Sequence, residues 1–63
     1  MGLNMKPKIR RKIMAIDHWG KYELFQEDND FYWKDGEWKT QKFTSKDEAW
    51  ERFKKGRINW YLD

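Results

Sequence analysis

The segment 31–53, FYWKDGEWKTQKFTSKDEAWERF, constrains the fold of this chain more than any other. Asp35-Gly36 stands between two runs rich in aromatic residues, which is the strongest short-range signal for a tight β-hairpin. Ser45 is followed three residues later by Glu48, a spacing typical of a capping box at the start of a helix. The sequence therefore predicts a hairpin that leads directly into a helix, and the rest of the chain must pack on this unit.

The hairpin has a chemically sensible register if Asp35-Gly36 forms a two-residue type I′ loop. Opposite charges then face each other in the first cross-strand pair, and two indoles face each other in the second. The predicted pairs are Lys34 with Glu37, Trp33 with Trp38, Tyr32 with Lys39, and Phe31 with Thr40. Phe43 has the opposite parity to Trp38, so either a bulge intervenes or Phe43 leaves the strand and points toward the helix.

The helix is predicted over residues 46–55, with Ser45 as the N-cap, Glu48 as its reciprocal N3 partner and Gly56 at the C′ position. Three of its residues fall on one side and are expected to face the sheet: Ala49, Trp50 and Phe53. Small Ala49 would allow a close approach of the helix to the sheet.

Shorter signals place strands on both sides of this unit. The apolar run Ile13 to Ile16 predicts a strand over 9–17 that is covered on both sides, with a buried helical turn as the competing interpretation. Residues 21–28 predict a second strand, followed by a turn at 28–30. Four large apolar residues in the tail 57–63 predict a final strand or a packed extended segment; they are Ile58, Trp60, Tyr61 and Leu62.

These elements define the expected fold class as α+β. We expect a small antiparallel β-meander of three to four strands, with one C-terminal helix packed on one face and room for a short final strand. Residues 9–63 would form a single domain, preceded by a flexible basic arm over 1–8. A chain of 63 residues buries only about 60% of its unfolded surface, and the absence of cysteine excludes disulfides. The high aromatic content, 19% of the chain, therefore predicts an aromatic core.

The charge of the chain is unevenly distributed. Residues 1–12 contain five cations and no acid: Lys6, Lys8, Arg10, Arg11 and Lys12. The remaining nine cations are outnumbered by the eleven acids of the chain. A basic arm is the usual electrostatic footprint for a polyanion partner. The alternative interpretation is a solvated tail that aids solubility.

Few residues of this chain are suited to catalysis or metal binding. His18 is the single histidine, and Ser45, the single serine, is already assigned to the helix cap. The acidic turn at 27–30 lacks the spacing of a calcium loop, and no glycine-rich phosphate loop is present. We therefore expect a protein that is not an enzyme, without metal or cofactor. No apolar run reaches the length of a membrane span, and no signal peptide is visible, so we expect no membrane association and a cytoplasmic location.

Two binding functions remain as hypotheses. The first is binding of nucleic acid or a nucleoprotein, through the basic arm and a hairpin face formed by Tyr32, Lys34 and Lys39, where cations would meet phosphates and the tyrosine would stack on a base. The alternative is a protein-binding module, such as a phage-type inhibitor or adaptor of a host machine. Its anchors would be exposed aromatic residues, of which Trp19, Trp60 and Tyr61 are the candidates. A homodimer formed through an edge strand is a variant of this alternative.

A motif in the hairpin and helix also carries a resemblance to a known family. Gly36 and Trp38 form a G-x-W hairpin pattern, and the residues that continue the match are Lys42, Phe43, Thr44, Glu48 and Ala49. This order resembles the small sheet-plus-helix DNA-binding domains at the N-termini of tyrosine recombinases, where K-x-F-x-T-x-x-E-A follows the hairpin. Thr44 stands one residue earlier than in that pattern. The resemblance covers about a third of the chain and implies a sheet with one helix after it.

Overall fold

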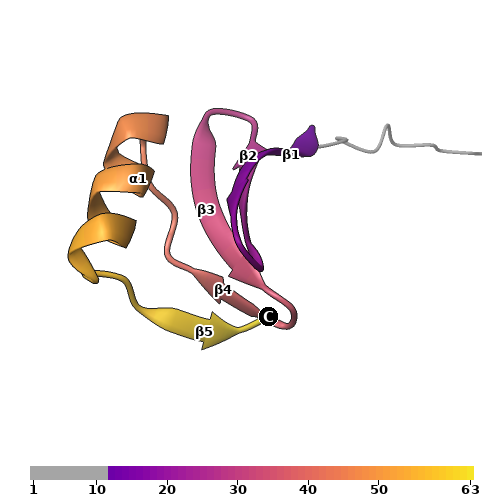
Figure 1. The fold of residues 1–63 in the computed structure, drawn as a ribbon. Coiled ribbons are helices and arrows are strands. Elements are labelled where there is room, and N and C mark those ends of the chain that lie inside the picture. The colour runs from indigo at the N-terminus through magenta and orange to yellow at the C-terminus, as the bar shows by residue number, and fades with distance from the viewer. Residues whose placement is uncertain (1–11) are drawn as a thin grey trace, which may run out of the picture.

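A computed structural model describes residues 12–63, which form a five-stranded antiparallel sheet and one helix (Figure 1). The strand order is β1-β2-β3-β4-β5, so each strand lies beside its neighbour in sequence. The elements are β1 (Ile13–Trp19), β2 (Tyr22–Glu27), β3 (Asp30–Asp35), β4 (Trp38–Thr40), α1 (Lys46–Lys55) and β5 (Trp60–Leu62). This architecture confirms the predicted α+β meander and shows that the tail adds a fifth strand. The basic arm predicted over 1–8 lies outside the described residues.

The helix α1 packs on one face of the sheet, which we call the helix-covered face; the opposite one is the open face (Figure 1). Successive residues of a strand point to opposite faces. The cross-strand pair of Leu24 and Trp33 lies on the helix-covered face, and both side chains are fully buried. The next pair, Phe25 and Tyr32, therefore lies on the open face. The chain thus builds its core on one side of the sheet.

Trp33 is the centre of the core. Its side chain is 0% exposed, and its indole N–H donates a hydrogen bond of 2.8 Å to the carbonyl oxygen of Ala49 in α1. Its ring stacks on Phe53 with centroids 4.2 Å apart and meets Trp50 in a T-shaped contact with centroids 4.8 Å apart. A buried indole needs a partner for its N–H, and the helix backbone supplies it. Leu24, Phe43 and Ala49 complete the buried cluster.

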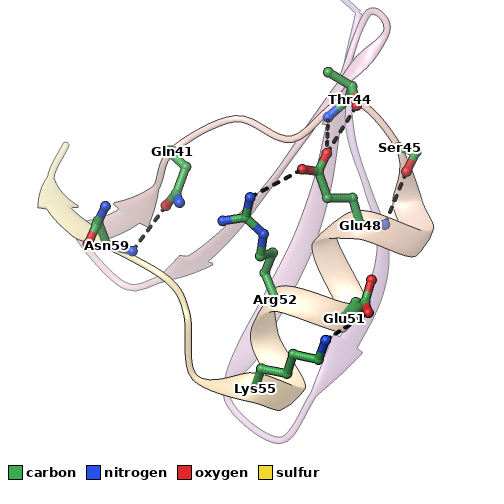
Figure 2. Close-up of polar contacts among 8 residues, drawn as sticks. All are labelled: Gln41, Thr44, Ser45, Glu48, Glu51, Arg52, Lys55 and Asn59. Carbon is green, nitrogen blue, oxygen red and sulfur yellow. Dashed lines mark hydrogen bonds and ion pairs between the residues drawn. The ribbon is translucent and has the colours of Figure 1, made fainter.

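The start of α1 is fixed by side-chain caps (Figure 2). As predicted, Ser45 is the N-cap, and its hydroxyl accepts a hydrogen bond of 3.0 Å from the backbone N–H of Glu48. The reciprocal bond differs from the expected capping box. The Glu48 carboxylate accepts from both the backbone N–H and the hydroxyl of Thr44, at 3.1 and 3.0 Å, one residue before the N-cap. Thr44 offers two donors close together, and these bonds hold the pKa of Glu48 below its usual value.

The end of α1 follows the prediction. Gly56 adopts φ 68°, a left-handed conformation that favours glycine, and its N–H closes the last turn on the carbonyl of Phe53. The chain then reaches β5, where Gln41 accepts a hydrogen bond of 3.1 Å from the backbone N–H of Asn59 (Figure 2). This bond ties the entry of β5 to the segment after β4.

The hairpin between β3 and β4 reverses at the predicted glycine, but its register differs from the prediction. Lys34 pairs with Lys39 and Asp35 pairs with Trp38, so the two loop residues are Gly36 and Glu37. A type I′ loop over 35–36 would require positive φ at both residues. In the observed turn only Gly36 has positive φ, 62°, which is typical of a type II′ turn and avoids strain at the aspartate. Trp38 therefore does not face Trp33.

The position of Phe43 explains why its parity is opposite to that of Trp38 in the predicted hairpin. It lies beyond the end of β4, where it exchanges two backbone hydrogen bonds with Phe31. The pairing of Phe31 with Phe43 is out of step with the β3–β4 register by one residue, so the chain bulges between Thr40 and Phe43. The side chain of Phe43 is buried beside Ala49 of the helix. Both predicted solutions, a bulge and a side chain directed to the helix, therefore occur together.

The burial predicted for β1 was wrong. Ile13 and Met14 are 51% and 45% exposed, and Ala15 is exposed as well. β1 is an edge strand, and the helix lies over the middle of the sheet at β3. The helix therefore does not cover most of β1. A bulge between Ala15 and Asp17 brings Ile16 to the core. Asp17 then lies 3.8 Å from the ammonium of Lys46 at the start of the helix.

Replacement of Trp33→Ala is expected to unfold the domain. Truncation of a buried tryptophan costs about 3–5 kcal/mol, while a domain of this size has a stability of roughly 3–9 kcal/mol. The matched control is Trp38→Ala, because Trp38 is 46% exposed and its loss should cost little. Thermal unfolding followed by circular dichroism measures both variants. Equal stability of the two variants would contradict the central place given to Trp33.

Replacement of Glu48→Gln tests the helix cap through its pH dependence. The folded-state pKa of Glu48 is lowered by the bonds from Thr44, so this stabilisation is complete above the unfolded pKa of about 4.3 and is lost as the pH falls through the folded pKa. Wild type should therefore have the higher Tm at pH 7, and the difference should shrink in acid. Glu51→Gln is the control, because Glu51 meets only the exposed Lys55 side chain. A Tm difference for Glu48→Gln that stays constant from neutral to acidic pH would contradict this account.

Candidate functional site

A groove of about 300 Å³ lies between the end of β1 and the helix; we call it the aromatic groove. It is lined by Trp19, Trp50, Phe53 and Lys54. Trp19 meets Trp50 edge to face, with centroids 6.2 Å apart and ring planes at 87°, and Trp50 meets Phe53 in the same way. Trp19 is 62% exposed, which is the highest value among the large apolar residues of the described chain. The groove is therefore a preformed apolar surface at the rim of the core.

Local structure places each residue of this groove. Trp19 is the last residue of β1, followed by Gly20 with φ 61°, so the chain reverses directly after the ring. Trp50 and Lys54 are one helical turn apart on α1 and lie on the same side of it. The ring of Phe53 stacks on the buried ring of Trp33. The groove thus depends on the contact between strand and helix, which the sequence spacing alone does not reveal.

The charge at this groove comes from Lys54. Most cations of the described chain pair with a carboxylate, including Lys46 with Asp17 and Lys55 with Glu51. Within residues 12–63, the cations without such an ion pair are Lys12, Lys54 and Arg57. An unpaired ammonium beside three aromatic rings attracts an acidic group and repels a cation.

The open face carries a second cluster. Lys34 and Lys39 are cross-strand neighbours, and the carboxylate of Asp63 lies between them, 3.2 Å from the first ammonium and 3.1 Å from the second. The hydrogen bond from Lys39 and, to a smaller extent, that from Lys34 hold the pKa of Asp63 below its usual value. The same contact with Asp63 raises the pKa of Lys39. The backbone N–H of Asp63 also donates to the carbonyl of Glu37 at 2.7 Å, which holds Asp63 beside the hairpin loop.

Tyr32 belongs to this cluster but cannot stack on a base as predicted. Its side chain is 7% exposed, because its ring stacks on Phe25 with centroids 5.8 Å apart and lies under the ammonium of Lys39 at 5.7 Å. The structure thus brings together three predicted nucleic-acid contacts, Tyr32, Lys34 and Lys39, although the tyrosine is buried under Lys39 instead of facing solvent. Lys12 is exposed. The other predicted cations, Lys6, Lys8, Arg10 and Arg11, lie outside the described residues.

The predicted protein-binding aromatics are separated by the fold. Trp19 and Tyr61 are exposed, but they lie on opposite faces of the sheet. Trp60 is half-buried, with its ring 5.7 Å from that of Tyr22, and packs against the core. The remaining members of the aromatic groove were not singled out from the sequence as contacts. Their periodicity had assigned Trp50 and Phe53 to the core, and nothing in the sequence marked Lys54.

Within residues 12–63, no helix combines the length and the apolar character needed to cross a membrane, and no three metal-binding side chains form a group. Comparison of the chain with protein-family models, curated protein sequences and solved structures found no match.

Proposed function

We propose that this protein is a non-enzymatic binding module that holds a polypeptide partner in the aromatic groove. The observation that carries the proposal is the exposure of Trp19 beside the rings of Trp50 and Phe53. Tryptophan is a frequent hot-spot residue of protein interfaces, because it offers a large apolar area at a low cost in conformational entropy.

The groove is organised before any partner arrives. Trp33 holds Phe53, and the edge-to-face contact with Trp50 orients Trp19. A partner would therefore lose less free energy to the ordering of these side chains than it would on a flexible surface. A volume of about 300 Å³ is at the lower end of ligand pockets, which suits one or two side chains of a peptide.

The ammonium of Lys54 at the aromatic groove limits which ligands the groove can bind. Three aromatic rings could form a cage for a quaternary ammonium ion, but the ammonium of Lys54 at the same groove opposes a cationic ligand. An apolar or aromatic side chain with a nearby carboxylate satisfies both features. We therefore propose an acidic peptide segment with an apolar anchor as the partner.

Trp19→Ala is expected to remove this binding without unfolding the domain. Peptides selected from a displayed random library on the wild-type protein should be enriched in apolar residues flanked by acids. They should lose at least about tenfold in affinity for Trp19→Ala, the effect of a hot-spot residue. Trp38→Ala is the matched control, because Trp38 is also an exposed tryptophan but lies outside the groove.

Two results would contradict the groove as the binding site. The first is selected peptides that bind Trp19→Ala as well as wild type. The second is equal losses for Trp19→Ala and Trp38→Ala. Thermal unfolding of each variant separates a loss of binding from a loss of fold.

Binding of nucleic acid is a second candidate function, and the specific observation for it is the side-by-side position of Lys34 and Lys39 on the open face. The sequence adds the five cations of residues 1–12. Cations in the predicted N-terminal arm and on a sheet face would contact phosphates without reading the base sequence. Most of the other cations of the described residues each pair with a carboxylate of their own, whereas Lys34 and Lys39 share that of Asp63, so the charge of this lysine pair is not fully neutralised by its acid.

Affinity for a short single-stranded oligonucleotide should therefore fall with salt, with a log–log slope of about −0.7 for each phosphate that is neutralised. The double variant Lys34→Gln/Lys39→Gln should reduce both the affinity and the slope. The control, Lys46→Gln/Lys55→Gln, loses the same charge from cations that are also paired but belong to the helix. Affinity that does not change with salt, or equal effects of the two double variants, would refute contact through the open face.

A further inference from the structure

The carboxylate of Asp63 is bound by two ammonium groups at once. One oxygen lies 3.2 Å from Nζ of Lys34, and the other lies 3.1 Å from Nζ of Lys39. Two like charges directly opposite each other in a sheet repel, so this lysine pair is favourable only with an anion between its members. The structure therefore contains a two-point site for an oxyanion, occupied by a side chain of the same protein.

We propose that Lys34 and Lys39 form a phosphate-binding site on the open face, and that Asp63 occupies this site until a phosphate group displaces it. The inference rests on the second candidate function, binding of nucleic acid. A phosphate group presents two oxygens to two donors as a carboxylate does, and it carries at least the same charge. Asp63 is thus a built-in competitor that lowers the affinity of this site for phosphate.

The surroundings of the pair favour exchange of the anion. The side chains of Lys39 and Asp63 are 38% and 41% exposed, so water and salt reach the ion pairs and weaken them. The ring of Tyr32, which is itself packed on Phe25, lies under the ammonium of Lys39. This ring keeps the ammonium near its place when the carboxylate leaves.

Two other acids, Glu27 and Glu23, lie near the pair of Lys34 and Lys39. Glu27, which attracts Lys39 electrostatically, lies 3.3 Å from the ammonium of Lys42. Glu23 is opposite Lys34 on β2 and is exposed. Asp63 is therefore the carboxylate that contacts both ammonium groups, and it is the one whose removal should open the site.

Asp63→Asn is the test, because it removes the charge and keeps the shape. The variant should bind inorganic phosphate and a short single-stranded oligonucleotide roughly fivefold more tightly than wild type, the size of effect expected from one exposed charge pair. Phosphate should shift the NMR signals of the Lys34 and Lys39 side chains. Glu51→Gln is the matched control: it also removes one acid and releases one lysine, Lys55, and its affinity should stay within about twofold of wild type.

A gain for Asp63→Asn that disappears when Lys39→Gln is added supports the site. Equal gains for Asp63→Asn and Glu51→Gln would overturn it, because net charge would then explain the effect. Absence of phosphate-induced shifts at Lys34 and Lys39 in Asp63→Asn would also overturn it. If phosphate binds there and the oligonucleotide binds no more tightly than phosphate alone, the site stands and the nucleic-acid function fails.

Discussion

The hydrogen bond from the indole of Trp33 to the carbonyl of Ala49 determines how the helix lies on the sheet. A buried indole N–H without a partner is costly, so the helix must keep Ala49 at this ring. The methyl group of Ala49 permits that approach. Phe53 then stacks on the same ring, Trp50 meets that ring in a T-shaped contact, and Trp50 orients Trp19. The exposed groove is thus a direct consequence of one contact in the core.

Local sequence signals predicted the elements of this fold well, because each depends on residues close together in the chain. The cap of Ser45, the left-handed Gly56 and the reversal at Gly36 all involve neighbours within a few positions. The hairpin register was missed because the position of Gly36, the one residue of this turn with positive φ, and not the best charge pairing, fixed the loop. The exposure of Ile13 was missed for a different reason: an apolar run does not reveal whether a strand is central or at an edge.

The candidate sites were harder to predict than the fold. A short chain with many aromatic residues must expose some of them, which led to Trp19, Trp60 and Tyr61 as candidates; Trp19 and Tyr61 are exposed, whereas Trp60 is half-buried. The groove itself needs the strand and the helix side by side, and this is tertiary information. The site on the open face depends on the observed register, because only this register makes Lys34 and Lys39 direct neighbours, and on β5, which brings Asp63 to them. No local pattern links residues so far apart in the chain.

The two proposed surfaces are physically independent of each other. The aromatic groove lies on the helix-covered side, and the lysine pair lies on the open face with Tyr32 beneath it. Apolar burial in the groove should depend little on salt, whereas phosphate contacts weaken steeply as salt rises. A molecule with both surfaces could therefore hold a peptide and a phosphate backbone at once without competition between them. If a nucleoprotein is the partner, high salt should release the nucleic acid and leave the polypeptide bound.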